Sequence, residues 1–208
     1  METKKIQHLL FDFGGVLYQI DQEKTLTLFK DYIDNKQLIQ SLNLNDFLAN
    51  PFFKKFETGM ITAAEFRDAV RNYFNISISN KKFDEFWNAT LIAPFSDTYK
   101  MLNMVKKHYK IHLLSNTNEI HYNYFYPQCR DFLSLFDNEF YSHKIGLMKP
   151  DAEVFKYVTK KLNTQPENIL FIDDLKRNIV SAKSLGLQTY LFDYDKNRKK
   201  LLDILLRF

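Results

Sequence analysis

The chain has 208 residues, of which 45% are hydrophobic and 26% are charged, as expected for a globular protein with a substantial core. Its net charge of +4 is too small to indicate a nucleic-acid-binding protein. The single cysteine, Cys129, excludes an intrachain disulfide, and no stretch is apolar over the roughly 18 residues that a transmembrane helix needs. We therefore expect a cytoplasmic protein without a secretory signal that binds neither membranes nor nucleic acid.

The first predicted element is a buried strand at residues 6–13, a short apolar run that ends at Gly14 and Gly15. From about residue 21 to 93 the apolar spacing is instead helical throughout. In that stretch Thr62 and Glu65 have the spacing of a capping box at a helix start. We expect these helices to form one inserted block that lies over the strand ends as a lid.

The remainder of the chain alternates helices and strands. Its pattern predicts helices at 97–108, 119–134, 151–163, 177–185 and 196–207, and strands at 110–115, 138–142, 168–172 and 187–192. This alternation is typical of a doubly wound parallel sheet. The predicted fold is therefore α/β, with a Rossmann-like parallel sheet core made of residues 1–17 and 94–208 and a helical cap inserted at 18–93.

Polar residues follow several of the predicted strands at the point where each strand ends. Asp12 lies near the end of the first strand, Ser115-Asn116 closes the strand at 110–115, and Asp173-Asp174 closes the strand at 168–172. Lys149-Pro150 lies in a loop after a short apolar segment. An open parallel sheet gathers the carboxyl ends of its strands along one edge, where ligands bind. We therefore expect these side chains to meet at one site.

The residue types at this edge suit phosphate chemistry. A carboxylate such as Asp12 can attack phosphorus and form an aspartyl-phosphate, and Gly14-Gly15 would let the backbone approach the phosphate closely. Ser115-Asn116 offers a hydroxyl and free amides before a helix, a natural anion site. Each residue alone also has a simpler explanation as a helix cap or loop residue. Their combination favours a functional site.

The charges of Lys149 and of the acidic pair Asp173-Asp174 also suit phosphate chemistry. The ammonium of Lys149 could neutralise a transferring phosphoryl group and hold the nucleophile ionised, although a lone loop lysine is usually solvated. Adjacent carboxylates such as Asp173 and Asp174 repel each other, so a cation best explains the pair, and hard oxygen donors suit Mg²⁺. Asp12 with one or both of these acids would suffice to bind the ion.

Taken in order, these motifs resemble those of the haloacid dehalogenase (HAD) superfamily over essentially the whole chain. The four matching stretches are 11–17 (Phe-Asp-Phe-Gly-Gly-Val-Leu), 115–118 (Ser-Asn-Thr-Asn), Lys149-Pro150, and Asp173-Asp174 with Asn178. The helical insertion, including Glu57-Thr58-Gly59 and Glu65-Phe66, is similar to the small cap of subfamily I. Gly14, the 115–118 stretch with His121, and the acidic pair most resemble bacterial α-glucose-1-phosphate phosphatases.

The resemblance implies a role for each residue. Asp12 would be the nucleophile and a metal ligand, with the carbonyl of Gly14 and the carboxylate of Asp174 as further ligands. Asp173, the fourth candidate at the metal site, would act through water or hydrogen bonds. Ser115, Asn116 and Lys149 would hold the phosphoryl oxygens, and water would then hydrolyse the aspartyl-phosphate.

Gly14 departs from the family pattern, because most phosphatases of the superfamily carry a general acid and base aspartate at that position. Losing a positioned proton donor typically slows a reaction by about 10²–10⁴-fold, and a good leaving group, such as that of a sugar-1-phosphate, would suffer least. Asp21 or His121 could replace the donor. We instead expect Asp21 to cap a helix and His121 to be an exposed helix residue.

We expect a magnesium-dependent phosphomonoester hydrolase acting on a small phosphorylated metabolite, such as a sugar-1-phosphate, as a monomer or homodimer. One alternative is a metal-independent 2-haloacid dehalogenase, which the acidic pair Asp173-Asp174 argues against. A second is a non-catalytic binding module that lost turnover through Gly14, and a third, closer variant is an acyl-phosphate or nucleotide phosphatase. Four aromatic residues of the cap could shape the substrate pocket, but a place in the cap core is the simpler interpretation: Phe52, Phe53, Phe56 and Trp87.

Overall fold

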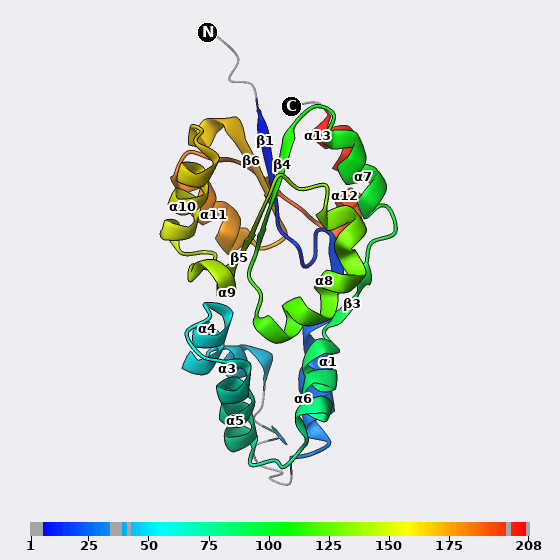
Figure 1. The fold of residues 1–208 in the computed structure, drawn as a ribbon, viewed down its shortest axis with the longest axis vertical. Helices are drawn as coiled ribbons and strands as arrows, with labels where there is room; N and C mark the ends of the chain where they lie inside the picture. The colour runs from blue at the N-terminus through cyan, green and yellow to red at the C-terminus, as the bar shows by residue number, and fades with distance from the viewer. Residues whose placement is uncertain (1–5, 34–38, 41–42, 199–200, 207–208) are drawn as a thin grey trace.

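The computed structural model of the protein describes residues 6–33, 39–40, 43–198 and 201–206. In these residues five parallel strands form one sheet in the order β5-β4-β1-β6-β7 (Figure 1). The strands are β1 (His8–Phe11), β4 (Lys110–Ser115), β5 (Asn138–Tyr141), β6 (Ile169–Asp173) and β7 (Gln188–Leu191). The predicted parallel sheet is confirmed, and each strand lies where the apolar runs indicate.

The first strand lies at the centre of the sheet, between β4 and β6. All its residues are buried, as a strand covered on both faces requires. Phe11 pairs with Leu113 on one side and with Ile172 on the other. This register brings the residue after β1, Asp12, level with the ends of β4 and β6.

Helices cover both faces of the sheet and make three layers (Figure 1). One face packs Leu9, Phe11 and Leu113 against α7 (Thr98–Val105), α8 (Glu119–Leu133) and α13 (Leu201–Leu205). The other packs Leu10 and Phe171 against α10 (Ala152–Leu162) and α11 (Lys176–Ser184). Because successive residues of β1 point to opposite faces, one strand supplies both cores. The doubly wound α/β architecture is confirmed.

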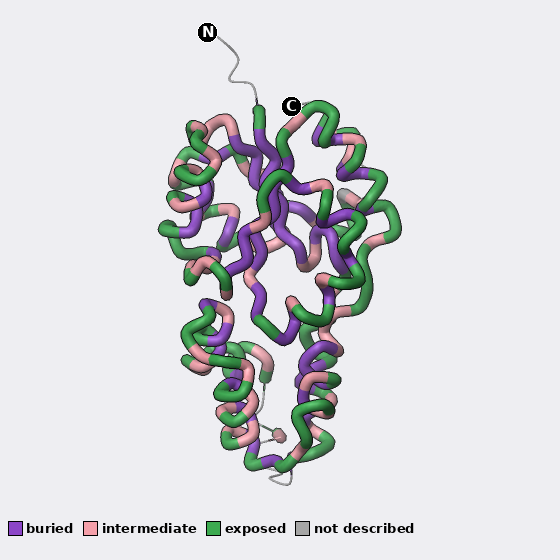
Figure 2. Tube along the Cα trace, in the orientation of Figure 1, coloured by how far each residue is buried: buried purple, intermediate pink, exposed green. Residues whose placement is uncertain are grey.

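The inserted cap has an aromatic core of its own. Among the described residues its helices include α1 (Gln22–Lys30), α3 (Leu44–Leu48), α4 (Pro51–Glu57), α5 (Ala63–Phe74) and α6 (Asn80–Asn88). Buried rings stack at their centre, among them Phe56 on Phe66 at 4.1 Å between ring centroids. The predicted capping box of Thr62 and Glu65 starts α5. The cap lies beyond the carboxyl ends of the strands (Figures 1 and 2).

The two chain segments that join the cap to the core pair with each other, which the sequence pattern did not predict. Leu91–Pro94 was expected to be the end of a helical stretch, but it forms a strand, β3, antiparallel to β2 (Tyr18–Ile20). A four-residue apolar run does not distinguish strand from helix by periodicity alone, and here the backbone of the opposite segment decided it. The expected cap boundaries at residues 18 and 93 both fall in this ribbon.

The carboxyl-terminal part of the chain also differs from its prediction. In place of one helix at 196–207, the described residues form two short helices, α12 (Tyr194–Asn197) and α13 (Leu201–Leu205). Packing of Leu201 and Leu205 into the core accounts for the amphipathic pattern that suggested a longer helix. Within the described ranges, no helix has both the length and the apolar character needed to span a bilayer.

Candidate active site

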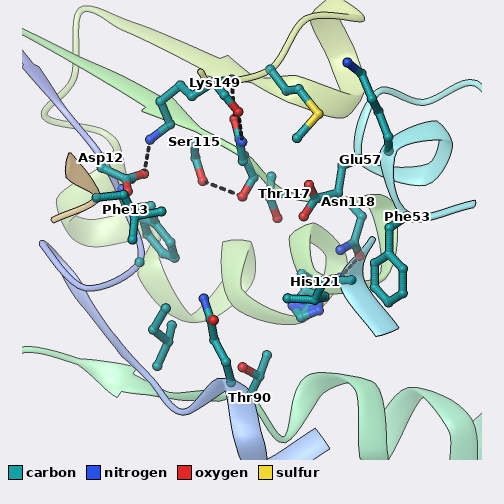
Figure 3. A pocket seen from close by; sticks show the side chains of 18 of the residues that line it. Asp12, Phe13, Phe53, Glu57, Thr90, Ser115, Thr117, Asn118, His121 and Lys149 are labelled. Atoms are coloured by element: carbon teal, nitrogen blue, oxygen red, sulfur yellow. Dashed lines mark hydrogen bonds and ion pairs between the residues drawn. The ribbon is translucent and has the colours of Figure 1, made fainter. Parts of the chain in front are cut away.

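Asp12 lies at the centre of the site, directly after the central strand (Figure 3). Its backbone N–H donates to the carbonyl of Ile172 at 2.9 Å, which extends the sheet by one residue and fixes its position. Its carboxylate oxygen Oδ1 accepts a hydrogen bond from the N–H of Phe13 at 2.7 Å. The side chain is buried. A rigid, buried carboxylate at a strand end is well placed to act as a nucleophile.

Lys149 bridges two carboxylates at this point. Its ammonium Nζ lies 2.6 Å from Oδ1 of Asp12 and 2.7 Å from Oδ2 of Asp173, and its side chain is only 1% exposed. Burial alone would lower the pKa of Lys149, but these two carboxylates raise it above its usual value. The two carboxylates therefore favour the charged form of the ammonium. Lys149 is a buried part of the site and not a solvated loop residue.

Asn116 holds this lysine by its backbone. Its side-chain Nδ2 donates to the carbonyl of Lys149 at 2.8 Å, and its Oδ1 accepts the N–H of Lys149 at 2.9 Å. The side chain is thus engaged with the protein. The hydroxyl of the neighbouring Ser115 donates a hydrogen bond of 3.4 Å to the carbonyl of Asn116, a weak interaction that a ligand could replace.

The acidic pair has two different environments. Asp173 is fully buried, and its oxygens accept hydrogen bonds from the N–H of Leu175 at 2.8 Å and the side chain of Asn178 at 3.0 Å, besides the lysine contact. Asp174 is partly exposed and lines the cavity. A Cβ atom at Gly15 would lie only 2.3 Å from Oδ2 of Asp174. Gly15, with φ of +76°, therefore allows close approach of the backbone to this carboxylate.

Together these groups form a site that fits a divalent cation. Asp12, Asp173 and Asp174 each place a carboxylate oxygen within 4.8 Å of the others. Burial raises the pKa of Asp12 to about 8 against the opposing charge of Lys149, and burial followed by repulsion from Asp173 raises the pKa of Asp174 to about 6. Three carboxylates thus face a single ammonium, and a bound cation would offset the remaining negative charge.

One further atom is consistent with this interpretation. The Oδ1 atom of Asn178 is buried and has no hydrogen-bond partner among the described residues. A buried carbonyl oxygen of this kind is usually satisfied by water or an ion. Water molecules carried by a hydrated Mg²⁺ would meet that need, because the ion keeps several waters when few carboxylates bind it.

The acidic residues and the lysine open into a cavity of about 600 Å³ that lies between core and cap. That volume suits a small metabolite. The cap supplies Phe53 and Trp87, which belong to its aromatic core and also line the cavity. These two rings therefore both pack the cap and shape the pocket. Phe56 is buried in the cap core, and Phe52 packs against it.

Contacts from helix α4 close the cap over the cavity. Lys54 forms an ion pair of 3.1 Å with Asp151 of the core. A Cβ atom at Gly59 would lie 2.3 Å from the carbonyl oxygen of His143, so the turn after α4 packs directly against the core backbone. Helix α4 and helix α9 (Ser142–Ile145) are also in contact. The cap is therefore in direct contact with the core beside the cavity.

Two candidate proton donors differ in position. Asp21 is exposed and accepts the N–H of Glu23 as the N-cap of α1, which confirms the structural interpretation. His121 was expected to be exposed, and that expectation is wrong. It is buried, lines the cavity and packs edge-on against Trp87 at 5.2 Å between ring centroids. Burial, reinforced by the nearby His143, lowers the pKa of His121 to about 3.

Charged residues that the motifs did not single out as site residues also line the cavity, among them Glu57 and Arg177. Glu57 ends α4, and its side chain points into the cavity (Figure 3). Arg177 comes from the first turn of α11. Glu57 belongs to the stretch that resembles other caps, but no spacing in the sequence relates it to Asp12. From the helical period alone, the side chain of Glu57 could point either toward the cavity or away from it.

Comparisons with known proteins agree with this geometry. The family profile described as haloacid dehalogenase-like hydrolase matches residues 6–186. A D-ribitol-5-phosphate phosphatase of Bacteroides thetaiotaomicron is 25% identical over 206 residues, which cover 97% of this chain and 98% of the relative. A sesquiterpene phosphatase of Aspergillus oryzae is 21% identical and covers 86% of this chain and 85% of its own.

Solved structures are also similar. A HAD family enzyme from Bacteroides thetaiotaomicron, crystallised in complex with magnesium and inorganic phosphate, superposes with a TM-score of 0.82. It is 32% identical and covers 94% of this chain and 98% of its own. A predicted HAD-like family hydrolase from Porphyromonas gingivalis has the same TM-score with 26% identity, and the superposition covers 98% of each chain.

Proposed function

Because the chain belongs to the haloacid dehalogenase-like hydrolases, we propose that it is a magnesium-dependent phosphatase acting through an aspartyl-phosphate on a small sugar or polyol phosphate. The observation that carries the proposal is the buried ammonium of Lys149 between Asp12 and Asp173, beside the cavity that Asp174 lines. A buried lysine that holds a carboxylate in place and remains charged suits the transfer of a phosphoryl group.

In the first step an oxygen of Asp12 attacks the phosphorus of the substrate, and the bond from phosphorus to the ester oxygen breaks. Lys149 favours the ionised form of Asp12 against the effect of burial, and it offsets the charge of the phosphoryl oxygens. The hydroxyl of Ser115 could exchange its weak hydrogen bond to the carbonyl of Asn116 for one to a phosphoryl oxygen. Asn116 acts chiefly by positioning Lys149, since both polar atoms of its side chain are bound to the lysine backbone.

Asp12, Asp174 and the backbone carbonyl of Gly14 would hold the Mg²⁺ ion. When bound, the ion supplies positive charge that offsets the phosphoryl group and lowers the pKa of the carboxylates. Asp173 supports the site through its hydrogen bonds to Lys149 and Asn178. In the second step water attacks the phosphorus of the aspartyl-phosphate, which releases inorganic phosphate and restores the Asp12 carboxylate.

The cavity supports a small, partly polar substrate. Its volume of about 600 Å³ would enclose a five- or six-carbon sugar phosphate, and polar side chains such as Gln22, Asn45 and Thr90 lie among apolar ones. The leaving-group argument favours a sugar-1-phosphate, and the similarity to a D-ribitol-5-phosphate phosphatase favours a polyol phosphate. Both substrates belong to one chemical class, and the experiment below ranks them.

The test measures phosphate release from glucose 1-phosphate, ribitol 5-phosphate and para-nitrophenyl phosphate, in magnesium and in EDTA. We expect release in magnesium only, and we expect Asp12→Asn to reduce it by at least about 10³-fold, as loss of a nucleophile does. Asp131→Asn, an exposed position near the end of α8, is the matched control. Equal release in EDTA, or halide release from a 2-haloacid without phosphate release, would overturn the proposal.

A further inference from the structure

Helix α4 holds Glu57 in a defined position over the cavity. Thr58, the residue after Glu57, is buried and donates its hydroxyl to the carbonyl of Lys54 at 2.6 Å. Gly59 packs against the backbone of His143, and Lys54 pairs with Asp151 one turn before Glu57. The end of the helix is thus anchored to the core on both sides of Glu57. An anchored side chain of this kind can act on a bound substrate.

The carboxylate of Glu57 points into the cavity and is not held by another side chain of the described residues. It lies on the cap side of the cavity, across from Asp12 (Figure 3). Among the described residues, none makes a hydrogen bond or ion pair with it. Burial raises its pKa to about 7, and the charges of Arg177 and Lys149 oppose that rise. A carboxyl group with a pKa near neutrality can both donate and accept a proton.

Two other groups do not suit this role. Burial lowers the pKa of His121 to about 3, so its imidazole is neutral at neutral pH and lacks the acidic second proton that a general acid gives up. Asp21 is exposed and occupied as a helix cap. Gly14, where most phosphatases of the superfamily carry an acid, has no side chain at all. None of these three positions therefore supplies a proton donor to the departing oxygen.

We propose that Glu57 is the general acid and base that the core lacks at Gly14, which rests on the phosphatase function proposed above. As Asp12 attacks phosphorus and the bond to the ester oxygen breaks, the protonated Glu57 transfers its proton to that departing oxygen. The resulting Glu57 carboxylate then takes a proton from the water whose oxygen attacks the aspartyl-phosphate. Phosphate and the Asp12 carboxylate are released, and Glu57 is protonated again.

This role widens the substrate class. With a proton donor in the cap, the departing oxygen can belong to an unactivated alcohol, as in ribitol 5-phosphate, and not only to a sugar hemiacetal. The donor is in place only while α4 contacts the core. Hydrolysis of alkyl phosphates is therefore coupled to cap closure, whereas an aryl phosphate, whose leaving group needs no proton, depends on Glu57 only in the second step.

The test compares wild type with Glu57→Gln, which keeps the size of the side chain. For ribitol 5-phosphate we expect kcat to fall by about 10²–10⁴-fold. For para-nitrophenyl phosphate we expect a rapid burst of one nitrophenol per enzyme followed by slow turnover, because aspartyl-phosphate still forms but hydrolyses slowly. Glu85→Gln, an exposed residue on α6 of the same cap, is the control and should behave as wild type.

Wild-type turnover of ribitol 5-phosphate by Glu57→Gln would overturn the proposal. So would an equal loss on both substrates without a burst, which would indicate a structural role. Partial rescue of the alkyl phosphate rate by Glu57→Asp would support it. Failure of the phosphatase function itself is distinguishable, because the wild-type enzyme would then release phosphate from neither substrate.

Discussion

The side chain of Asn116 bonds to both polar backbone atoms of Lys149, at 2.8 Å and 2.9 Å, although the residues are 33 positions apart in sequence. This pair joins the end of β4 to the loop before α10. It thereby places the lysine ammonium between Asp12 and Asp173. The position of the charge therefore depends on an amide that never touches it.

We predict that Asn116→Ala lowers kcat by about 10²-fold, the effect of misplacing a catalytic group by roughly 1 Å. Two backbone groups would also lose their partners, at a cost of about 1–3 kcal/mol if they remain buried. Phosphate release and the free energy of unfolding measure the two effects. Asn72→Ala, an exposed position on α5, is the control. Unchanged kcat in Asn116→Ala would show that the lysine holds its place without this pair.

Lys149→Met removes the ammonium but keeps the apolar stem. Asp12 and Asp173 would then be buried without a counter-charge, and breaking a buried ion pair in this way typically costs about 3–5 kcal/mol. We expect loss of phosphate release together with a lower free energy of unfolding in urea. Magnesium should restore part of the stability by replacing the missing charge, without restoring activity. If Lys149→Met had the same free energy of unfolding as wild type in EDTA, the lysine would not be the counter-charge that stabilises Asp12 and Asp173.

The effect of Glu57→Gln on stability should depend on pH. Because the pKa of Glu57 is raised from an ordinary 4.5 to about 7, its contribution to stability is full below pH 4.5 and is lost as the pH rises through 7. Glutamine carries no charge at any of these pH values. Relative to wild type, Glu57→Gln should therefore gain stability between pH 5 and pH 8, as measured by the difference in Tm.

Wild type and Glu57→Gln share the other charged and titratable groups around this cavity, so the effects of these groups on Tm cancel to first order in the difference. The shared groups are Asp12, Lys54, His121, Lys149, Asp151, Asp174 and Arg177. A difference in Tm between the two proteins that does not vary with pH would show that Glu57 titrates as an ordinary exposed carboxylate. Glu85→Gln, at an exposed position on α6 of the same cap, is the control for this comparison.

Gly15 and Gly146 allow a matched comparison, because their φ angles are +76° and +72°. Alanine at either position adopts a left-handed backbone conformation at a cost of about 1–2 kcal/mol. At Gly15 the new Cβ would also lie 2.3 Å from Asp174, whereas at Gly146 it meets nothing within 4 Å. We predict that both variants lose stability, but only Gly15→Ala loses the rise in Tm that magnesium produces. An intact magnesium response in Gly15→Ala would exclude Asp174 as a ligand.

The sequence alone was sufficient for the sheet and for one side of the site. Buried strands such as β1 and β6 are continuous apolar runs that end at polar residues, and parallel strands necessarily bring those ends together. Asp12, Ser115 and Asp173 could therefore be placed at a common edge from local pattern alone. The antiparallel pairing of β2 with β3 could not, because a four-residue apolar run carries no period of its own.

What only the tertiary structure decided is the side of the site that the cap provides. Glu57 and Asp12 are 45 positions apart, and no rule of local spacing relates a helix in an inserted block to the strand end that it covers. His121 was expected at the surface, but it is buried beside the cavity. Burial lowers its pKa, so the imidazole there is neutral. The pKa values of Glu57 and His121 depend on what surrounds each group in space. Such shifts arise from desolvation and from charges brought close by folding, which a linear sequence does not contain.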